Sequence, residues 1–298
     1  MKIVEVGPRD GLQNEAGLVS VESKVNLIEA LAGAGLRHIE CGSFVSARWV
    51  PQMANTGAVF ARLKRLPDVY YSALVPNLTG LAEAAHAGVT EVAVFAAASE
   101  TFSRRNINCS IDESITRLGA VASEAKKQGM RVRGYVSCVL GCPYEGAVPL
   151  ANVTRVAEAL AQMGCYEVSL GDTIGVGTAR RAQAMVNAVG QEVPMQQLAV
   201  HFHDTWGQAL ANILASMESG VSTIDSSVAG LGGCPYAKGA SGNVATEDVV
   251  YMLNGMGVET GIDLEGVAAA GRAIMEQLGR ASASKAAAAM AARQESND

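Results

Sequence analysis

Short apolar runs alternate with longer amphipathic segments along nearly the whole chain. The apolar runs are rich in Val, Ile and Leu and have the length of buried β-strands. Eight such runs are found, at residues 3–6, 38–42, 69–74, 91–96, 131–137, 167–170, 198–203 and 223–228.

The segments between these runs have helical periodicity, and several begin with an N-capping residue such as Ser20 or Asn77. They cover residues 21–34, 52–65, 78–87, 111–128, 151–163, 178–190, 207–219 and 245–255. Eight alternating pairs predict an α/β protein with a (β/α)8 TIM barrel. The alternative is an open doubly wound sheet, which would be expected to carry a GxGxxG turn after its first strand, whereas residues 7–11 read GPRDG.

The 298 residues contain no Pro/Ser-rich linker, so we expect one main domain. The barrel is predicted over residues 1–258. Residues 259–298 form a C-terminal helical extension, amphipathic over 264–278, Ala-rich over 285–293 and frayed at the end. Its helices offer more apolar surface than the barrel needs, which favours a homodimer.

Composition narrows the class of protein further. Hydrophobic residues make up 49% of the chain and aromatic residues only 5%, which suits helices packed on a parallel sheet. A net charge of −6 provides no general attraction to nucleic acid or to an anionic membrane. The six cysteines include no CxxC pair, and the first residues look like a strand and not like a leader, so we expect a soluble cytoplasmic protein with reduced thiols.

His201 and His203 alternate within an apolar run where a strand is predicted to end. Residues two apart in a strand project to the same side, so both imidazoles can face one ion. The carboxyl ends of the strands are also where barrel enzymes place their chemistry. The alternative is that one or both histidines are hydrogen-bonded structural residues near the core.

Polar side chains follow the other predicted strands as well. A long loop with five glycines, residues 229–243, follows the eighth strand and could close over a ligand, the alternative being a flexible connection. The remaining strand-end residues are Arg9 and Asp10 after the first strand, Glu40 and Ser43 at the second, Tyr135 at the fifth, and Asp172 and Thr173 at the sixth.

A metal site can be assembled from these residues. His201 and His203, together with Asp10 and the amide of Asn243, would make an octahedral nitrogen and oxygen site completed by water or substrate. Without a thiolate ligand, Mg²⁺ or Mn²⁺ fits this set better than structural zinc. Such an ion would act as a Lewis acid on a substrate hydroxyl and carbonyl.

With these residues assembled, the chain closely resembles the 3-hydroxy-3-methylglutaryl-CoA lyase family. The resemblance runs from the first residues to about residue 280, and its last stretch, with Gly-Gly-Cys-Pro-Tyr at 232–236, is similar to the active-site signature of the family. Related metal-dependent synthases share the Arg-Asp opening and the His-x-His pair but lack that loop. The matching stretches are residues 4–15, 106–110, 133–138, 141–146, 169–175, 201–203 and 227–236.

The resemblance implies cleavage of 3-hydroxy-3-methylglutaryl-CoA to acetyl-CoA and acetoacetate, in leucine degradation or ketone-body formation. It also implies that the metal ligands are Asp10, His201, His203 and Asn243, and that Arg9 and Cys234 are the catalytic pair.

Chemistry assigns these side chains consistent roles. Asp10 or His201 would take the hydroxyl proton, Arg9 would meet the charge on the thioester oxygen, and Cys234 would protonate the enolate carbon. Glu40 would orient Arg9 or a water. Asp172 would make a substrate contact or support one. The remaining predicted contacts to the CoA thioester are Ser43, Tyr135 and Thr173 near the reaction, and Arg48, Arg104, Arg105, Asn106 and Lys238 toward the CoA phosphates.

Several alternatives stay open at this point. Cys234 could act as a nucleophile that forms an acyl-enzyme, although lyase chemistry needs no acyl transfer. The substrate could be a longer 3-hydroxy-3-alkylglutaryl-CoA, such as the isohexenyl compound. A Claisen-type acyl-CoA/oxo-acid synthase and a non-catalytic barrel that keeps a metal site are the other two readings of the same residues.

Overall fold

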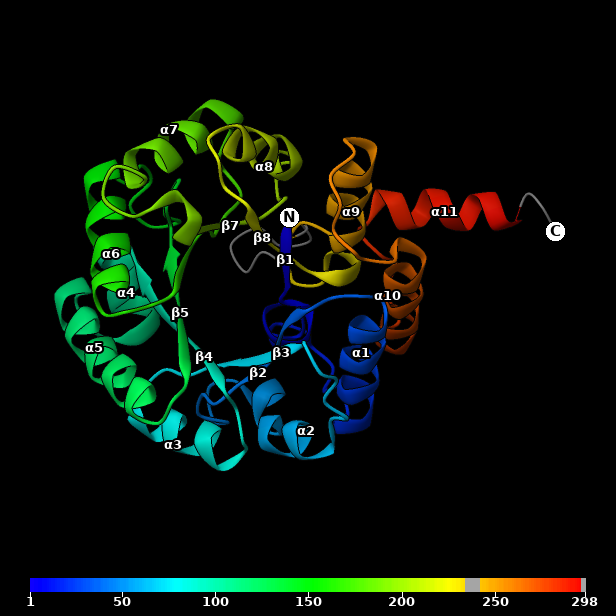
Figure 1. Cartoon of the computed structure of the whole chain (residues 1–298), viewed down its shortest axis with the longest axis horizontal. Helices are drawn as coiled ribbons and strands as arrows, with labels where there is room; N and C mark the ends of the chain where they lie inside the picture. The colour runs from blue at the N-terminus through cyan, green and yellow to red at the C-terminus, as the bar shows by residue number, and fades with distance from the viewer. Residues whose placement is uncertain (234–241, 296–298) are drawn as a thin grey trace.

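The computed structural model describes residues 1–233 and 242–295, and it contains one closed barrel of eight parallel strands in the order of the sequence. Each strand pairs with the next, and β8 pairs with β1 to close the barrel (Figure 1). The strands are β1 (Lys2–Glu5), β2 (His38–Ser43), β3 (Tyr70–Leu74), β4 (Glu91–Ala97), β5 (Arg131–Ser137), β6 (Glu167–Asp172), β7 (Leu198–Phe202) and β8 (Thr223–Ser226).

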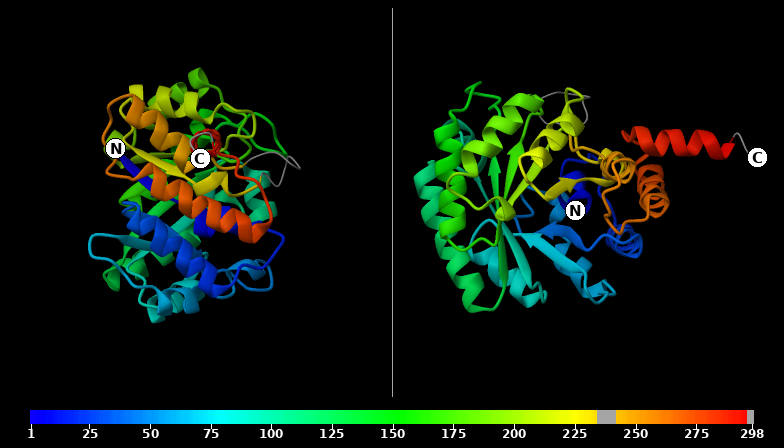
Figure 2. Two further views of the ribbon diagram at one scale, coloured as in Figure 1. Left: turned by 90° about the vertical axis from the view of Figure 1, so that its right-hand side faces the viewer. Right: turned by 45° about the horizontal axis from the view of Figure 1, so that its top comes forward.

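Helices surround this barrel as an outer ring, which confirms the predicted TIM barrel (Figures 1 and 2). The open doubly wound sheet is excluded because the sheet closes on itself. The helices of the ring are α1 (Val21–Gly33), α2 (Thr56–Arg62), α3 (Leu78–His86), α4 (Glu100–Ile107), α5 (Ile111–Lys127), α6 (Leu150–Gln162), α7 (Ala179–Val189), α8 (Ala209–Glu218) and α9 (Thr246–Gly255).

Three details differ from the predicted elements. The helix expected over 52–65 is divided into a 3-10 turn, η2 (Pro51–Met53), and the shorter α2. Helix α4, which the periodicity did not predict, begins at an N-cap where the Ser99 hydroxyl accepts the N–H of Phe102. The last strand ends at Ser226, because residues 228–230 turn into η4 (Val228–Gly230) with Ala229 at a left-handed φ of 57°.

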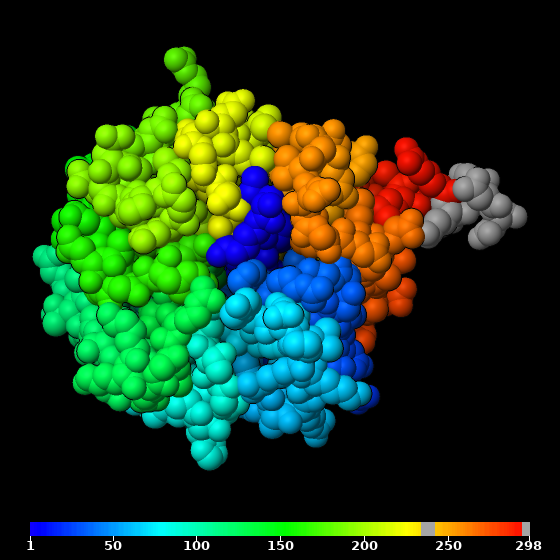
Figure 3. Space-filling model, viewed as in Figure 1, coloured from blue at the N-terminus to red at the C-terminus, as the bar shows by residue number. Residues whose placement is uncertain are grey.

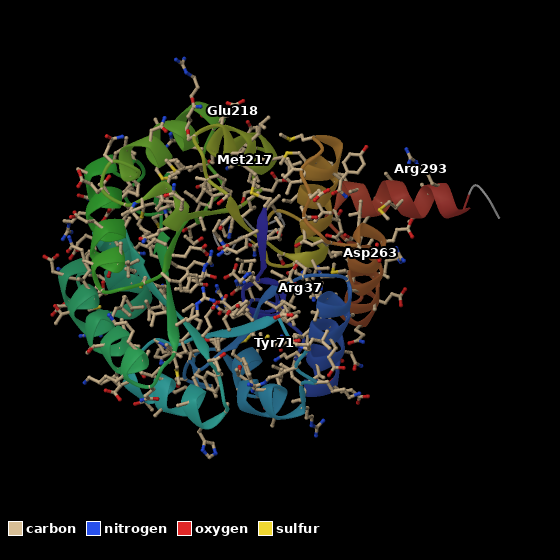
Figure 4. All side chains as sticks on the ribbon, in the orientation of Figure 1. Arg37, Tyr71, Met217, Glu218, Asp263 and Arg293 are labelled. Carbon is tan, nitrogen blue, oxygen red and sulfur yellow. The ribbon has the colours of Figure 1, made fainter. Side chains whose placement is uncertain are left out.

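Apolar side chains fill the layer between the strands and the helices, whereas charged side chains occupy part of the barrel interior (Figure 4). Arg133 on β5 is 2% exposed and pairs with Glu167 on β6 and with Asp225 on β8, at 2.7 Å in each case. Buried charges of this kind are retained only when they are paired and hydrogen-bonded. The two carboxylate partners of Arg133 come from two other strands of the barrel, β6 and β8.

Two further helices follow the barrel, α10 (Leu264–Leu278) and α11 (Lys285–Glu295). Helix α10 packs on α1, and the carboxylate of Asp248 on α9 accepts the N–H groups of Lys285 and Ala286 at the start of α11. Helix α11 then leaves the ring, and Arg293 lies well outside it (Figures 3 and 4). The domain boundary at 258 and the homodimer stay predictions.

No helix in residues 1–233 or 242–295 is long and apolar enough to span a bilayer.

Gly35, which follows α1, provides a test of how the C-terminal segment is joined to the barrel. Its φ is 96°, and a Cβ there would overlap the carbonyl oxygen of Gly261. We expect Gly35→Ala to lower the free energy of unfolding by about 2–4 kcal/mol through strain and overlap. The control is Gly33→Ala, since a Cβ at this helical position meets nothing within 4 Å and should stabilise by up to about 1 kcal/mol. Urea denaturation of both variants measures the difference, and equal stabilities would contradict the expectation.

Candidate active site

Closure of the barrel brings Asp10, His201 and His203 together. Asp10 lies in η1 (Gly7–Gly11), a tight turn in which the N–H groups of Arg9, Asp10 and Gly11 all point to the Val6 carbonyl. His201 is the last residue but one of β7, and His203 directly follows the strand; their ring centroids lie 5.6 Å apart. One potential ligand atom from each of the three side chains lies within 4.8 Å of the others.

Asn243 is brought to the same place by the chain that returns after β8. It pairs with His203 in an isolated antiparallel bridge, and its amide nitrogen donates to Asp10 Oδ2 at 2.8 Å and to the Leu231 carbonyl at 3.2 Å. The return also needs Gly232, whose φ is 105° and where a Cβ would lie 2.8 Å from the Asn243 amide. Cys234 and Lys238 lie outside the described residues.

The guanidinium of Arg9 joins two carboxylates in this cluster. Its Nε donates to Glu40 Oε2 and its Nη1 to Asp10 Oδ1, both at 2.5 Å. Burial alone would lower the pKa of Arg9, but the charges of Glu40 and Asp10 outweigh it and raise that pKa above the ordinary value. Arg9 therefore stays a cation, and its guanidinium is held by one hydrogen bond to each of the two carboxylates.

The charge states of the cluster suit a divalent cation. Burial alone would raise the pKa of Asp10, but Arg9 and the two imidazoles hold it well below its usual range, so Asp10 is an anion. Burial, with the neighbouring His201, lowers the pKa of His203 to about 4, so its imidazole is neutral near pH 7. His203 Nδ1 is buried and has no hydrogen-bond partner among the described residues. The Asp10 anion and the neutral His203 imidazole, with its unpartnered buried nitrogen, form a donor set that fits the predicted ion.

The side chains predicted near the reaction are also at this end of the barrel. The Ser43 hydroxyl is buried and has no partner in the described part of the chain. The Tyr135 ring lies 5.6 Å from the Arg9 guanidinium, and the His201 ring meets it at 83° with centroids 6.0 Å apart. The Thr173 hydroxyl accepts the N–H of Cys138 at 2.9 Å.

Asp172 is directed toward its own loop. Its carboxylate accepts the N–H of Gly177 at 2.7 Å and of Val176 at 3.3 Å, and its side chain is fully buried. A Cβ at Gly177 would lie 2.8 Å from Asp172 Oδ2, so this glycine is required for the approach. In this structure Asp172 shapes the loop after β6.

Three of the basic residues predicted to meet the CoA phosphates, Arg48, Arg104 and Arg105, are not part of the polar cluster. Arg48 is exposed in the loop after β2. Arg104, Arg105 and Asn106 are exposed on α4, a helix that the sequence did not predict. Arg104 pairs with Glu100 at 2.8 Å, and the Arg105 guanidinium lies 4.3 Å from the Tyr144 ring.

The charged groups beneath the cluster were not predicted from the sequence. Asp225 accepts from Arg133 and from the Ser169 hydroxyl at 2.7 Å, and its Oδ2 lies 3.3 Å from His201 Nδ1. A signal was present, because strands that are buried on both faces are usually continuous apolar runs, whereas polar residues occupy alternate positions in β5 and β8.

Two buried carboxylates support the turns that carry the cluster. Glu5 accepts the N–H of Gly7 at 2.7 Å and of Val228 at 2.9 Å, which joins η1 to η4. Glu247 accepts the N–H of Ala229 with both oxygens, at 3.0 and 2.9 Å. Burial raises the pKa of Glu5 to about 7 and that of Glu247 to about 8.

The family model described as HMGL-like matches residues 1–274 of this chain. The chain belongs to the HMGL-like family. The match covers the whole barrel, including every residue of the described cluster.

Known members of the family are similar over nearly their full length. A Pseudomonas aeruginosa protein named 3-hydroxy-3-isohexenylglutaryl-CoA/hydroxy-methylglutaryl-CoA lyase is 58% identical over 98% of each chain. The cytoplasmic 3-hydroxy-3-methylglutaryl-CoA lyase of Danio rerio is 60% identical over 96% of this chain and 85% of its own. The crystal structure of hydroxymethylglutaryl-CoA lyase from Pseudomonas aeruginosa superposes with a TM-score of 0.96 at 58% identity, covering 98% of this chain and 97% of that one.

The raised pKa of Glu247 predicts a pH-dependent stability. Between about pH 4.5 and pH 8 the folded protein keeps a proton that the unfolded chain releases, so this group lowers stability as the pH rises through that window. Glu247→Gln stays neutral and keeps an acceptor for Ala229. Relative to wild type, it should gain about 2–4 kcal/mol in free energy of unfolding from pH 5 to pH 8.

Urea denaturation at both pH values measures this gain. The matched control is Glu276→Gln, which removes an exposed carboxylate on α10 and should follow wild type at both pH values. Parallel curves for wild type and Glu247→Gln would contradict the expectation.

Proposed function

We propose that this chain cleaves 3-hydroxy-3-methylglutaryl-CoA to acetyl-CoA and acetoacetate. The observation that carries the proposal is the cluster of Asp10, His201 and His203 at the carboxyl ends of the strands, with Arg9 beside it. The family relatives that bear this activity in their names support it, at 58% and 60% identity over nearly the whole chain.

Asp10, His201, His203 and Asn243 would hold one divalent ion, Mg²⁺ or Mn²⁺. When bound, such an ion supplies Lewis acidity toward the oxygen atoms of the substrate. The protein's own contribution is the geometry of the ligands. Asp10 is kept ionised and in place by Arg9 and Asn243, and His203 is kept neutral by burial.

Arg9 is assigned to stabilise the negative charge that develops on the thioester oxygen of the substrate. Its Nε donates to Glu40 and its Nη1 donates to Asp10, and these two hydrogen bonds fix the orientation of the guanidinium. A preorganised cation needs no reorganisation when charge appears, which is the main source of such stabilisation. The buried, unpartnered Ser43 hydroxyl is assigned a hydrogen bond to the substrate.

Two proton transfers complete the reaction. The hydroxyl proton of the substrate goes to Asp10 or His201 before the carbon–carbon bond breaks, and the enolate carbon left on the thioester then takes a proton. The donor of that second proton is assigned to Cys234, as the resemblance implies. A homodimer and a cytoplasmic location are further parts of this proposal.

The test is acetoacetate formation from 3-hydroxy-3-methylglutaryl-CoA, measured after chelation and again after Mg²⁺ or Mn²⁺ is added back. Activity should disappear on chelation and return with either ion. Arg9→Met should lower kcat by about a hundredfold or more, because the group that meets the developing charge is gone. The control, Arg155→Met, removes an exposed arginine that pairs with Asp112 outside the barrel mouth and should leave kcat unchanged.

No turnover by folded, metal-loaded wild type would overturn the assigned substrate. Turnover of the isohexenyl compound alone would then move the assignment to the longer acyl chain, and consumption of an oxo acid with acetyl-CoA would move it to a synthase. Full activity in the presence of chelator would overturn the metal site.

A further inference from the structure

Asp225 is buried beneath the cluster and contacts His201. The other hydrogen-bond partners of the Asp225 carboxylate determine which nitrogen of His201 carries the hydrogen. His201 on β7 and Asp225 on β8 are direct partners in the strand register. This pairing sets the imidazole over the carboxylate, with His201 Nδ1 3.3 Å from Asp225 Oδ2. Asp225 itself is 1% exposed, so water does not compete for it.

Every other partner of this carboxylate is a hydrogen-bond donor. Arg133 donates through Nη2 to Oδ1 at 2.7 Å and through Nη1 to Oδ2 at 3.1 Å, and the Ser169 hydroxyl donates to Oδ2 at 2.7 Å. The guanidinium keeps the carboxylate ionised, and an ionised carboxylate can only accept. When the His201 ring carries a single hydrogen, that hydrogen must therefore reside on Nδ1.

The opposite nitrogen of the ring points to the cluster. His201 Nε2 lies 3.8 Å from Asp10 Oδ2, on the side where the ligand atoms converge. With the hydrogen on Nδ1, the lone pair of Nε2 is free for a cation.

We propose that Asp225 is a positioning residue that fixes the tautomer of His201, so that Nε2 is presented to the metal site before any ion binds. Arg133 holds Asp225 in place and ionised, which makes the barrel interior part of the metal site. This inference rests on the proposed function in one respect, which is the location of the metal site. Carboxylate partners of this kind typically contribute about tenfold to hundredfold in metal affinity.

The substitution that tests the proposal is Asp225→Asn. The shorter Arg133 bond, from Nη2, goes to Oδ1, so the carboxamide oxygen will take that position. The NH₂ group then takes the position of Oδ2, beside Ser169 and His201, at the loss of the longer Arg133 Nη1 contact. An NH₂ group donates to Nδ1, which moves the ring hydrogen to Nε2. A carboxylate-to-amide change at an orienting acid reverses a catalytic histidine in this way in other enzymes. The control is Ser169→Ala, which removes a donor from the same oxygen and leaves the carboxylate intact.

The readout is the two-bond ¹H–¹⁵N spectrum of the histidine rings in metal-free protein at pH 8. The chain has four histidines, and the His201 signals are assigned by their loss in His201→Asn. Wild type and Ser169→Ala should show the Nδ1–H tautomer, and Asp225→Asn the Nε2–H tautomer. Titration with Mn²⁺ alone should show a tenfold to hundredfold weaker Kd for Asp225→Asn and a change of less than about twofold for Ser169→Ala.

A wild-type His201 in the Nε2–H form overturns the proposal, and this holds even where Asp225→Asn does not fold. An unchanged Mn²⁺ affinity in an Asp225→Asn protein with the reversed tautomer also overturns it, as does an equal loss in Ser169→Ala. Neither measurement uses a substrate. A wrong substrate assignment would therefore leave both results intact, and failure here would leave the lyase assay unaffected.

Discussion

The buried guanidinium of Arg133 is the interaction on which the polar interior of this barrel depends. A guanidinium that is 2% exposed costs several kcal/mol unless carboxylates surround it, and Glu167 and Asp225 do so from β6 and β8. From Asp225 the contacts continue through His201 to Asp10, and from Asp10 through Arg9 to Glu40. The candidate active site lies at one end of a continuous series of contacts between charged and polar side chains.

This arrangement explains how an acidic cluster can be ready for a cation and still be stable without one. Asp10 and Glu40 share the charge of Arg9, so neither carboxylate is buried without a partner. Burial raises the pKa of Glu40 and the Arg9 charge opposes that rise; with both carboxylates ionised, the three groups carry one net negative charge beside two imidazoles. Binding of a divalent ion then adds attraction to a set of ligands that is already in place, and little ordering has to occur at that moment.

The sequence predicted the barrel and the histidine pair because both depend on local patterns. Alternation of apolar runs with helical segments is visible within about 30 residues, and two histidines two apart in a strand share a face whatever the rest of the chain does. The general rule that barrel chemistry lies after the strands then placed Asp10 and Asn243 beside them.

The parts that were missed depend on contacts between distant strands. The contact of His201 with Asp225 requires the register of β7 against β8, and the support of Ala229 by Glu247 requires the turn after β8. Helix α4 was not predicted because its eight residues are mostly polar, with Phe102 and Ile107 as its apolar side chains. Asp172 was expected to make a substrate contact or to support one, and the sequence alone did not show that the N–H of Gly177 in its own loop would donate to its carboxylate.

The most direct test of the central claim is the anomalous scattering of Mn²⁺ in crystals of the metal-loaded protein. The account predicts one peak bounded by the Asp10 carboxylate, the two imidazoles and the Asn243 amide, with His201 bound through Nε2. A peak at another place, or binding of His201 through Nδ1, would contradict it.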